Sequence, residues 1–358
     1  MIRRSLGMFA LAAVTSLVTA CSSGASSEEG SPSDSSEGAL ATNQSQLTLR
    51  YEGTDLGILL FRLNVSGNKV TGHAVPKPYD DYNSFSRGEV TGTTDGHGKF
   101  TFTWQIPNFS PKPTFEGTLA NDKLDGTITV DGVAPFAATM STIKPGTLEN
   151  GRPVSFLFGN QEKIGDCSAS YTGFEVVGLP NQDLERSIAA KVDDAAKKAV
   201  AACKGSINYV QGGLSRGVVR KDIISFTSGV YADDGGPTWK YTFGERGTYE
   251  IATGRELSLF GDVIQPGKEA ELAAALEHAI DTLDTYSVDA NEKQKLKDAM
   301  LSPAGKAKLP KTFALNDRGV SFAAEDYNTP KLHGVTVKYS DLTAILAPNG
   351  KAKSAWNP

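Results

Sequence analysis

Between Gln46 and Met140 the chain contains eight short segments in which apolar and polar residues alternate, without any helical periodicity. Alternation with a period of two is typical of half-buried β-strands, and the Gly, Asn and Asp residues between the segments are typical of tight turns. The expected strands are Gln46–Glu52, Gly57–Val65, Lys69–Val75, Ser86–Thr93, Lys99–Gln105, Thr114–Leu119, Lys123–Val130 and Ala134–Met140. We therefore expect residues 44–146 to form an all-β domain, an antiparallel meander that is closed or nearly closed into a small barrel.

The pattern changes after Ser141–Arg152, a stretch with Pro, Gly and Asn and little apolar content. The expected helices are Asn181–Cys203, Lys268–Tyr286, Ala290–Leu301 and Asp341–Leu346, the last capped by Ser340. The expected strands are Phe174–Val177, Val218–Ser228, Lys240–Glu250, Lys311–Leu315, Val320–Ala323 and Val335–Lys338. Because helices and strands do not alternate regularly, residues 150–350 are predicted to form a separate α+β domain.

The first twenty residues have the pattern of a bacterial lipoprotein signal peptide. A basic start is followed by an apolar or small run, Met8–Val18, and Cys21 comes directly after Ala20. The apolar run is too short to span a bilayer as a stable anchor. Residues 1–20 are therefore predicted to be removed, and Cys21 is predicted to carry the lipid, including palmitate. The alternative is an ordinary secreted protein with a chance cysteine at its cleavage point.

Residues 21–43 are predicted to form a lipid-anchored, low-complexity linker, because they are almost entirely small or polar. Loss of Arg3 and Arg4 with the signal peptide changes the formal net charge of −5 to about −7, which argues against nucleic acid as a partner. The expected location is the cell membrane or the outer membrane, to which the lipid attaches the protein so that it faces the periplasm or the exterior.

Cys167 and Cys203 are the other two cysteines of the chain. In the oxidising compartment that a lipoprotein enters, they are the only two that can pair with each other. A disulfide bond between them is the favoured interpretation, and two buried free thiols are the alternative.

The run Leu179–Leu346 contains several short sequence blocks in the same order in which a known family has them. They are Asp222–Tyr231, Thr248–Leu259 and Phe313–Phe322, followed by Tyr327, Gly334 and Val337–Leu342. These blocks resemble the extracytoplasmic domain of RsiV-type anti-sigma factors, which also occurs in the accessory region of the polysaccharide deacetylase PdaC. The family usually has a Gly-Gly-Ala-His run before the Thr-Gly block, whereas Tyr241–Gly247 stands there in this chain and contains no His.

The resemblance implies a binding module. The domain in RsiV-type proteins is associated with recognising lysozyme, and in the deacetylase it accompanies the chemistry rather than performing it. Nothing in the first 150 residues resembles a sigma-binding segment or a deacetylase. A lipid at Cys21 also stands where RsiV-type proteins have a transmembrane helix, so signalling to a cytoplasmic partner by the same route is not expected.

Ser215 lies in Gly213–Gly217, which matches the Gly-x-Ser-x-Gly pattern of hydrolase nucleophiles. That motif requires a sharp turn from a strand into a helix, whereas the residues after Ser215 are β-branched and strand-like. His278 and His333 could supply a base, but a Gly-rich turn is the favoured interpretation of the motif. The four His residues are scattered, without metal-ligand spacing, and no cofactor-binding motif is present, so neither a metal nor a cofactor is expected.

Aromatic residues suggest a binding surface in the first domain. Tyr79, Tyr82 and Phe85 stand in a polar loop between two expected strands, and Trp104 and Phe109 form a second group. Such rings suit stacking on a sugar or contact with a protein. The alternative is that some of them fold back and close one end of the barrel.

Taken together, these patterns predict a cell-envelope lipoprotein that binds peptidoglycan, another glycan or a lysozyme-like protein and performs no catalysis. One alternative is an envelope hydrolase of the esterase or amidase type that uses Ser215. Another is a structural or assembly lipoprotein whose barrel docks to a partner.

Overall fold

The computed structural model describes most of the chain after residue 44. The described ranges are 45–54, 56–77, 86–107, 112–204, 207–233, 240–284, 288–301, 312–323 and 334–357, and for residues 240–245 the description covers the backbone only. All of these residues belong to one compact unit, Ala39–Pro358. The predicted signal peptide, Cys21 and the whole of the predicted linker lie outside the described residues.

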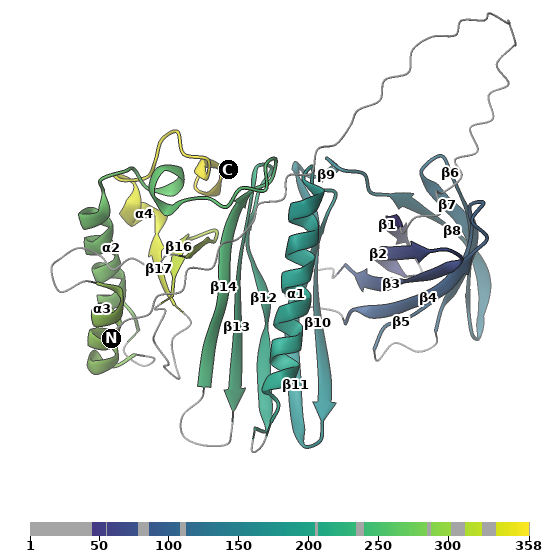
Figure 1. Cartoon of the computed structure of the whole chain (residues 1–358), viewed down its shortest axis with the longest axis horizontal. Helices are drawn as coiled ribbons and strands as arrows, with labels where there is room; N and C mark the ends of the chain where they lie inside the picture. The colour runs from purple at the N-terminus through teal and green to yellow at the C-terminus, as the bar shows by residue number, and fades with distance from the viewer. Residues whose placement is uncertain are drawn as a thin grey trace, which may run out of the picture. The chain divides into compact units, whose positions relative to one another are not determined.

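The first domain is a closed antiparallel barrel, as the alternation predicted (Figure 1). Its strands are β1 (Ser45–Gly53), β2 (Gly57–Ser66), β3 (Lys69–Pro76), β4 (Gly88–Thr94), β5 (Lys99–Gln105), β6 (Thr114–Ala120), β7 (Lys123–Val130) and β8 (Val133–Thr142). Each strand pairs with the next one along the chain. Tyr51 of β1 lies opposite Leu59 of β2 on one side and opposite Met140 of β8 on the other, which closes the barrel.

Large aromatic side chains fill the inside of the barrel. The rings of Phe61 and Trp104 meet edge to face with centroids 5.1 Å apart, and those of Phe102 and Phe115 stack at 5.2 Å. All four side chains are at most 1% exposed. The interior is therefore a packed hydrophobic core of the kind that side chains form in small barrels.

The second domain is built on a six-stranded sheet with the order β14-β13-β12-β11-β10-β9. Its strands are β9 (Leu148–Glu149), β10 (Arg152–Ile164), β11 (Cys167–Val177), β12 (Tyr209–Val219), β13 (Ile223–Asp233) and β14 (Lys240–Glu250). β11 and β12 are parallel, and the other neighbours are antiparallel. Helix α1 (Gln182–Ala202) connects the two parallel strands.

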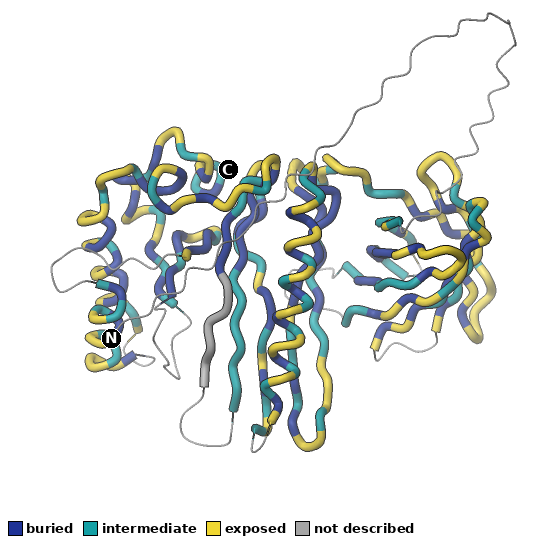
Figure 2. Tube along the Cα trace, viewed as in Figure 1, coloured by how far each residue is buried: buried dark blue, intermediate teal, exposed yellow. Residues whose placement is uncertain are grey.

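Helix α1 packs on the sheet through one apolar face, and exposed residues recur along it in Figure 2. The buried apolar residues follow helical spacing; they are Leu184, Ile188, Val192, Ala195 and Ala199. The side chain of Asn181 caps the helix by accepting a hydrogen bond from the backbone N–H of Leu184 at 2.9 Å. At the other end, a disulfide bond joins Cys203 to Cys167 at the start of β11, with Cα atoms 5.7 Å apart.

The C-terminal part of the domain forms a second hydrophobic cluster beside the large sheet. Its strands, β15 (Phe313–Leu315), β16 (Gly319–Phe322) and β17 (Val335–Lys338), form a three-stranded sheet. Its helical elements are η1 (Leu259–Val263), α2 (Glu269–Asp281), α3 (Ala290–Met300), α4 (Tyr339–Leu342) and η2 (Lys353–Ala355). Within the described ranges, no helix has the length and apolar character needed to cross a bilayer.

Several details of the second domain differ from the sequence prediction; among them, β9 was not predicted, and β11 and β12 begin earlier than predicted, at Cys167 and Tyr209. The expected strand Val218–Ser228 is a hairpin, because β12 ends at Val219 and β13 begins at Ile223. β-Branched residues on both sides of this turn conceal it in the hydrophobic pattern. The strand β10 was not predicted at all, and Ser340 lies inside α4, whose preceding residue makes no side-chain cap.

The disulfide bond stabilises the second domain by linking residues 36 positions apart in the chain. Replacing Cys167 and Cys203 by Ser should lower the free energy of unfolding by about 3 to 4 kcal/mol in the chain-entropy model. Urea denaturation of the variant and of the parent, each under non-reducing conditions, measures this difference. Equal midpoints and slopes would contradict a stabilising role for the bond.

Candidate functional site

Basic side chains of the barrel meet acidic side chains of the second domain along a surface that we call the seam. Its ion pairs join Arg62 to Glu185 (2.9 Å) and Glu175 (3.6 Å), His73 to Glu175 (2.8 Å), Arg87 to Asp193 (3.0 Å) and Glu175 (3.4 Å), and Lys77 and Arg50 to Glu149 (2.7 and 3.4 Å). Every basic member comes from the barrel or its adjoining segments, and every acidic member comes from β9, β11 or α1. The two domains therefore have complementary charges where they touch.

Glu175 is the most strongly perturbed group of the seam, with only 2% of the residue exposed. Its burial alone would raise the pKa, but a hydrogen bond from His73 and the positive charges of His73, Arg62 and Arg87 lower the pKa to about 2. Glu185 behaves differently, because burial raises its pKa and outweighs the opposing charge of Arg62. The carboxylate of Glu175 is thus held in its charged form inside the seam.

Two barrel cations also lie over aromatic rings of β10. The Lys77 ammonium is 5.8 Å from the centroid of the Phe156 ring, and the Arg87 guanidinium carbon is 5.3 Å from that of Phe158. Such cation–π contacts attract the two cations to β10 in addition to their ion pairs, and they require no further buried carboxylate. Strand β10 therefore contributes apolar surface to the seam while β9, β11 and α1 contribute the acids.

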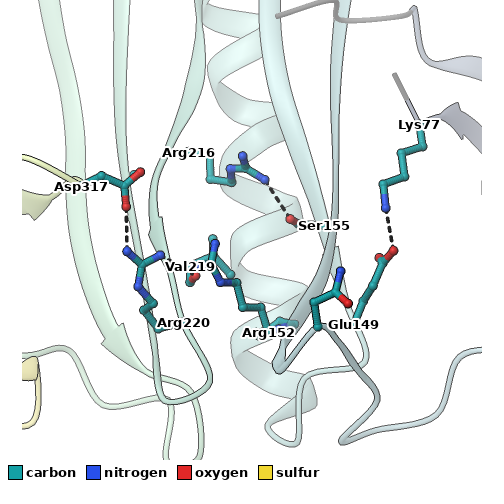
Figure 3. A pocket seen from close by; sticks show the side chains of 11 residues that line it. Lys77, Glu149, Arg152, Ser155, Arg216, Val219, Arg220 and Asp317 are labelled. Carbon is teal, nitrogen blue, oxygen red and sulfur yellow. Dashed lines mark hydrogen bonds and ion pairs between the residues drawn. The ribbon is translucent and has the colours of Figure 1, made fainter. Parts of the chain in front are cut away.

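A polar pocket of about 340 Å³ opens beside the seam (Figure 3). Its lining residues are Lys77, Glu149, Asn150, Arg152, Pro153, Ser155, Arg216, Gly217, Val219, Arg220 and Asp317. They come from the end of β3, the β9–β10 hairpin, β12 with its following turn, and the β15–β16 turn. We call this site the basic pocket, because four of its side chains are basic and two are acidic.

The local sequence explains how these elements reach the basic pocket. Asn150 and Gly151 have φ angles of 51° and 73°, so the β9–β10 turn uses residues that tolerate this backbone conformation. Ser155 alternates along β10 with Val154 and Phe156, which belong to the apolar cluster under α1. Because side chains alternate between the faces of a sheet, Ser155 points to the opposite face.

Figure 3 shows how the charged side chains of the basic pocket pair with their neighbours. Lys77 pairs with Glu149 at 2.7 Å, and Arg220 pairs with Asp317 at 2.7 Å. Arg216 donates a hydrogen bond to the Ser155 hydroxyl at 3.0 Å. The exposed side chain of Arg152 has no ion pair or hydrogen bond within the described part of the chain.

This arrangement suits anion binding. Guanidinium groups present planar forks of N–H donors that match carboxylate and phosphate oxygens. With four basic groups against two carboxylates, the lining carries a formal excess of two positive charges. Elsewhere in the described ranges, no group of three or more His, Cys, Asp or Glu side chains is placed to hold a metal ion.

The structure describes one of the five aromatic residues that the sequence suggested for binding. Tyr79, Tyr82, Phe85 and Phe109 lie outside the described residues. The prediction is wrong for Trp104, which is 1% exposed and packs inside the barrel. It shares the inward face of β5 with Phe100 and Phe102, because the three residues are spaced two apart.

The segment Gly213–Gly217 is not the turn that the sequence suggested. It lies within β12, and Ser215 is an exposed residue opposite Thr227 of β13. The chain continues as a strand to Val219 and then turns into β13, so no helix follows the serine. The nucleophile-elbow geometry is therefore missing at Ser215. His278 is exposed on α2, and His333 lies outside the described residues.

Sequence reasoning did not find the basic pocket. Arg152 and Arg216 are far apart in the chain and come together only because β11 alone separates β10 from β12. The one available signal is the charge of Arg216 and Arg220 within a stretch otherwise rich in Gly and Val. That signal does not show which other residues line the pocket.

No protein-family model and no curated protein matches the chain. Two solved structures of DUF3298 family proteins are similar to it. The protein from Pseudomonas aeruginosa PAO1 has 14% sequence identity and a TM-score of 0.36, over 55% of this chain and 95% of that one. The protein from Bacteroides fragilis has 15% identity and a TM-score of 0.38, over 58% of this chain and 99% of that one. At these TM-scores the likeness carries no argument about the site.

The low pKa of Glu175 predicts an acid-sensitive seam. A pKa of about 2 in the folded chain, below the ordinary 4.5, makes the charged form stabilising above the ordinary pKa. That contribution is lost as the pH falls through the folded pKa. Between about pH 6 and pH 2 the parent should lose about 3 kcal/mol more stability than Glu175→Gln. Urea denaturation across this range tests it, and parallel pH profiles would contradict it.

Proposed function

We propose that this protein is a cell-envelope lipoprotein that acts by binding rather than by catalysis, and that the basic pocket holds its ligand. The single observation behind the proposal is the formal excess of two positive charges in a pocket of about 340 Å³. That volume lies within the usual range of small-ligand sites. The chain as a whole is acidic, with a formal net charge of −5, so the positive charge of the pocket is a local feature.

The chemistry of the lining favours an anionic ligand of the cell wall. Peptidoglycan carries free carboxylates on its peptides, and these groups match guanidinium donors. The lining contains no aromatic ring, so stacking on an uncharged sugar receives no support from the described residues. Among the three expected ligand classes, we therefore place peptidoglycan before a neutral glycan or a lysozyme-like protein.

The resemblance of residues 179–346 to RsiV-type domains supports the binding role and keeps a lysozyme-like protein as the second candidate. A lipid on Cys21 and the low-complexity stretch 21–43 would tether the folded part to a membrane within reach of the wall. In this proposal the protein holds its ligand near the membrane surface.

Reversing one charge of the basic pocket should weaken the binding of peptidoglycan. The probe is the chain 39–358, which forms one compact unit, sedimented with purified insoluble peptidoglycan at fixed ionic strength. Arg152→Glu should raise the apparent Kd by about tenfold or more, because it replaces a donor with a repelling carboxylate. Arg186→Glu is the matched control, since Arg186 is exposed on α1 and outside the pocket.

The same assay with immobilised lysozyme separates the ligand classes. Retention by lysozyme alone would make the protein partner the correct ligand class. Retention by neither material would contradict the proposed function. A loss of binding in Arg152→Glu that the control shares would show a general electrostatic effect in place of a site.

Ser215→Ala should leave both binding and stability unchanged. Ser215 is exposed in the middle of β12, and an exposed substitution of this kind changes the free energy of unfolding by less than about 0.5 kcal/mol. Peptidoglycan sedimentation and urea denaturation of the variant measure the two quantities. An esterase or amidase activity of the parent that disappears in Ser215→Ala would contradict a role in binding alone.

A further inference from the structure

His73 is the one histidine within the described ranges that lies between the two domains. It stands on β3, with 19% of its side chain exposed, and its Nε2 atom is buried 2.8 Å from the Glu175 carboxylate. His97 and His278 are exposed, at the β4–β5 turn and on α2. Imidazole is the side chain that ordinarily changes its charge between about pH 5 and pH 8. The seam therefore contains a group whose charge can change near neutral pH.

Glu175 depends on His73 more than on its other two basic neighbours. Arg62 and Arg87 approach the Glu175 carboxylate to 3.6 and 3.4 Å, but each pairs more closely with an acid of α1, at 2.9 and 3.0 Å. His73 is nearer, at 2.8 Å, and forms an ion pair with no other acid in the described ranges. Because Glu175 is only 2% exposed, water contributes little to stabilising its charge. The nearest countercharge of this buried carboxylate is therefore the imidazolium form of His73.

Six charged groups stand beside His73 or join it through the ion pairs of the seam. They are Arg62 on β2, Glu89 on β4, Arg87 directly before β4, Glu175 on β11, and Glu185 and Asp193 on α1. The two arginines oppose a further positive charge, but each is paired with a carboxylate of α1. Burial raises the pKa of Glu185, yet even if that group is protonated, three acids face two arginines. The surroundings of His73 as a whole therefore favour its charged form.

We propose that the pair of His73 and Glu175 is a pH-sensitive clasp: the docked barrel holds His73 as an imidazolium, and docking weakens when the pH rises and the imidazole loses its proton. The two partners belong to different domains, so their attraction exists only in the docked state. A chain with a docked barrel therefore binds this proton more tightly than a chain whose barrel has moved away from the sheet. By linkage, docking is favoured at lower pH and loses this contribution as the pH rises through the range in which His73 titrates. The acid limit is set by Glu175, because below its pKa of about 2 the pair has no carboxylate.

Strand β3 connects the clasp to the basic pocket. His73 stands on this strand, and Lys77 follows directly after the strand ends at Pro76. Four residues of extended chain span about 13 Å, so β3 carries both side chains as one element. A change in docking at His73 therefore also acts on the wall of the pocket that Lys77 forms with Glu149. Docking can respond to pH in this way whether or not the pocket holds the proposed ligand.

The proton affinity of His73 tests the clasp directly. NMR follows the imidazole resonances of the chain 39–358 from about pH 5 to about pH 9, with His97 as the internal reference because it is exposed on the same barrel. His73 should bind its proton about tenfold more tightly in the parent than in Glu175→Gln, because the amide removes the nearest countercharge. The proton affinity of His97 should be the same in both chains. Equal proton affinities of His73 in the two chains would overturn the proposal.

Side chains of fixed charge at position 73 give a second test that leaves Glu175 intact. His73→Gln keeps a hydrogen-bond donor without the charge, and His73→Lys stays positive at every pH used. Between about pH 5.5 and pH 8.5, the folding equilibrium constant of the parent should fall about fivefold or more beyond that of either variant, as urea denaturation measures it. His97→Gln is the matched control and should follow the parent. A parent whose pH profile runs parallel to those of both variants is incompatible with the clasp.

Hydrogen exchange shows whether the effect of pH is an effect on docking. The backbone N–H of Arg87 on the barrel side donates to the Asn160 side chain of β10 at 3.0 Å, so it exchanges with solvent when the barrel moves away from the sheet. After correction for the intrinsic effect of pH, its protection factor in the parent should be about fivefold or more lower at about pH 8.5 than at about pH 5.5. The protection factor should not change in His73→Lys. Constant protection in the parent, or the same loss in His73→Lys, would refute the clasp.

Discussion

The buried carboxylate of Glu175 and its three basic neighbours from the barrel hold the two domains of this protein in register. An ionised carboxylate with 2% exposure is tolerable only if opposite charges and hydrogen bonds replace the water that it loses. Arg62 and His73, which pair across β2 and β3, and Arg87, which directly precedes β4, supply them from neighbouring strands of the barrel. Removal of any one partner leaves uncompensated charge in the seam, so the pairing specifies one docking of barrel on sheet.

The seam also forms part of the basic pocket, which we propose as the ligand site. Glu149 pairs with the barrel through Arg50 and Lys77, and with Lys77 it forms one wall of the basic pocket. The opposite wall comes from Arg220 and Asp317, which belong to the second domain alone. A site built in this way is complete only when the barrel is docked. Under the proposed function, ligand affinity and the docking of the barrel are therefore linked through Lys77.

Elements whose sequence pattern involves only neighbouring residues were predictable. Elements that depend on contacts with other parts of the chain were less predictable. All eight barrel strands appear where the alternation placed them, and the helix that begins after Asn181 is capped by that residue. In contrast, the turn between Val219 and Ile223 is concealed by β-branched residues on both sides, and Trp104 was assigned to a surface although its spacing from Phe100 and Phe102 places it inward. Both errors arose because the prediction relied on the type of each residue. The position of a residue along the strand determines whether it faces the core or lies in a turn.

Sequence alone determined the class of each domain, because strand alternation, helical spacing and turn residues act over a few neighbouring positions. It also indicated the Cys167–Cys203 pair through the compartment that the predicted signal peptide implies. Only the tertiary structure decided which charges meet. Arg152 and Arg216 share a pocket because the strand order places β11 alone between their strands, and the barrel cations face the acids of the sheet because the domains dock there. Such proximity depends on packing across the whole chain, which no local pattern records.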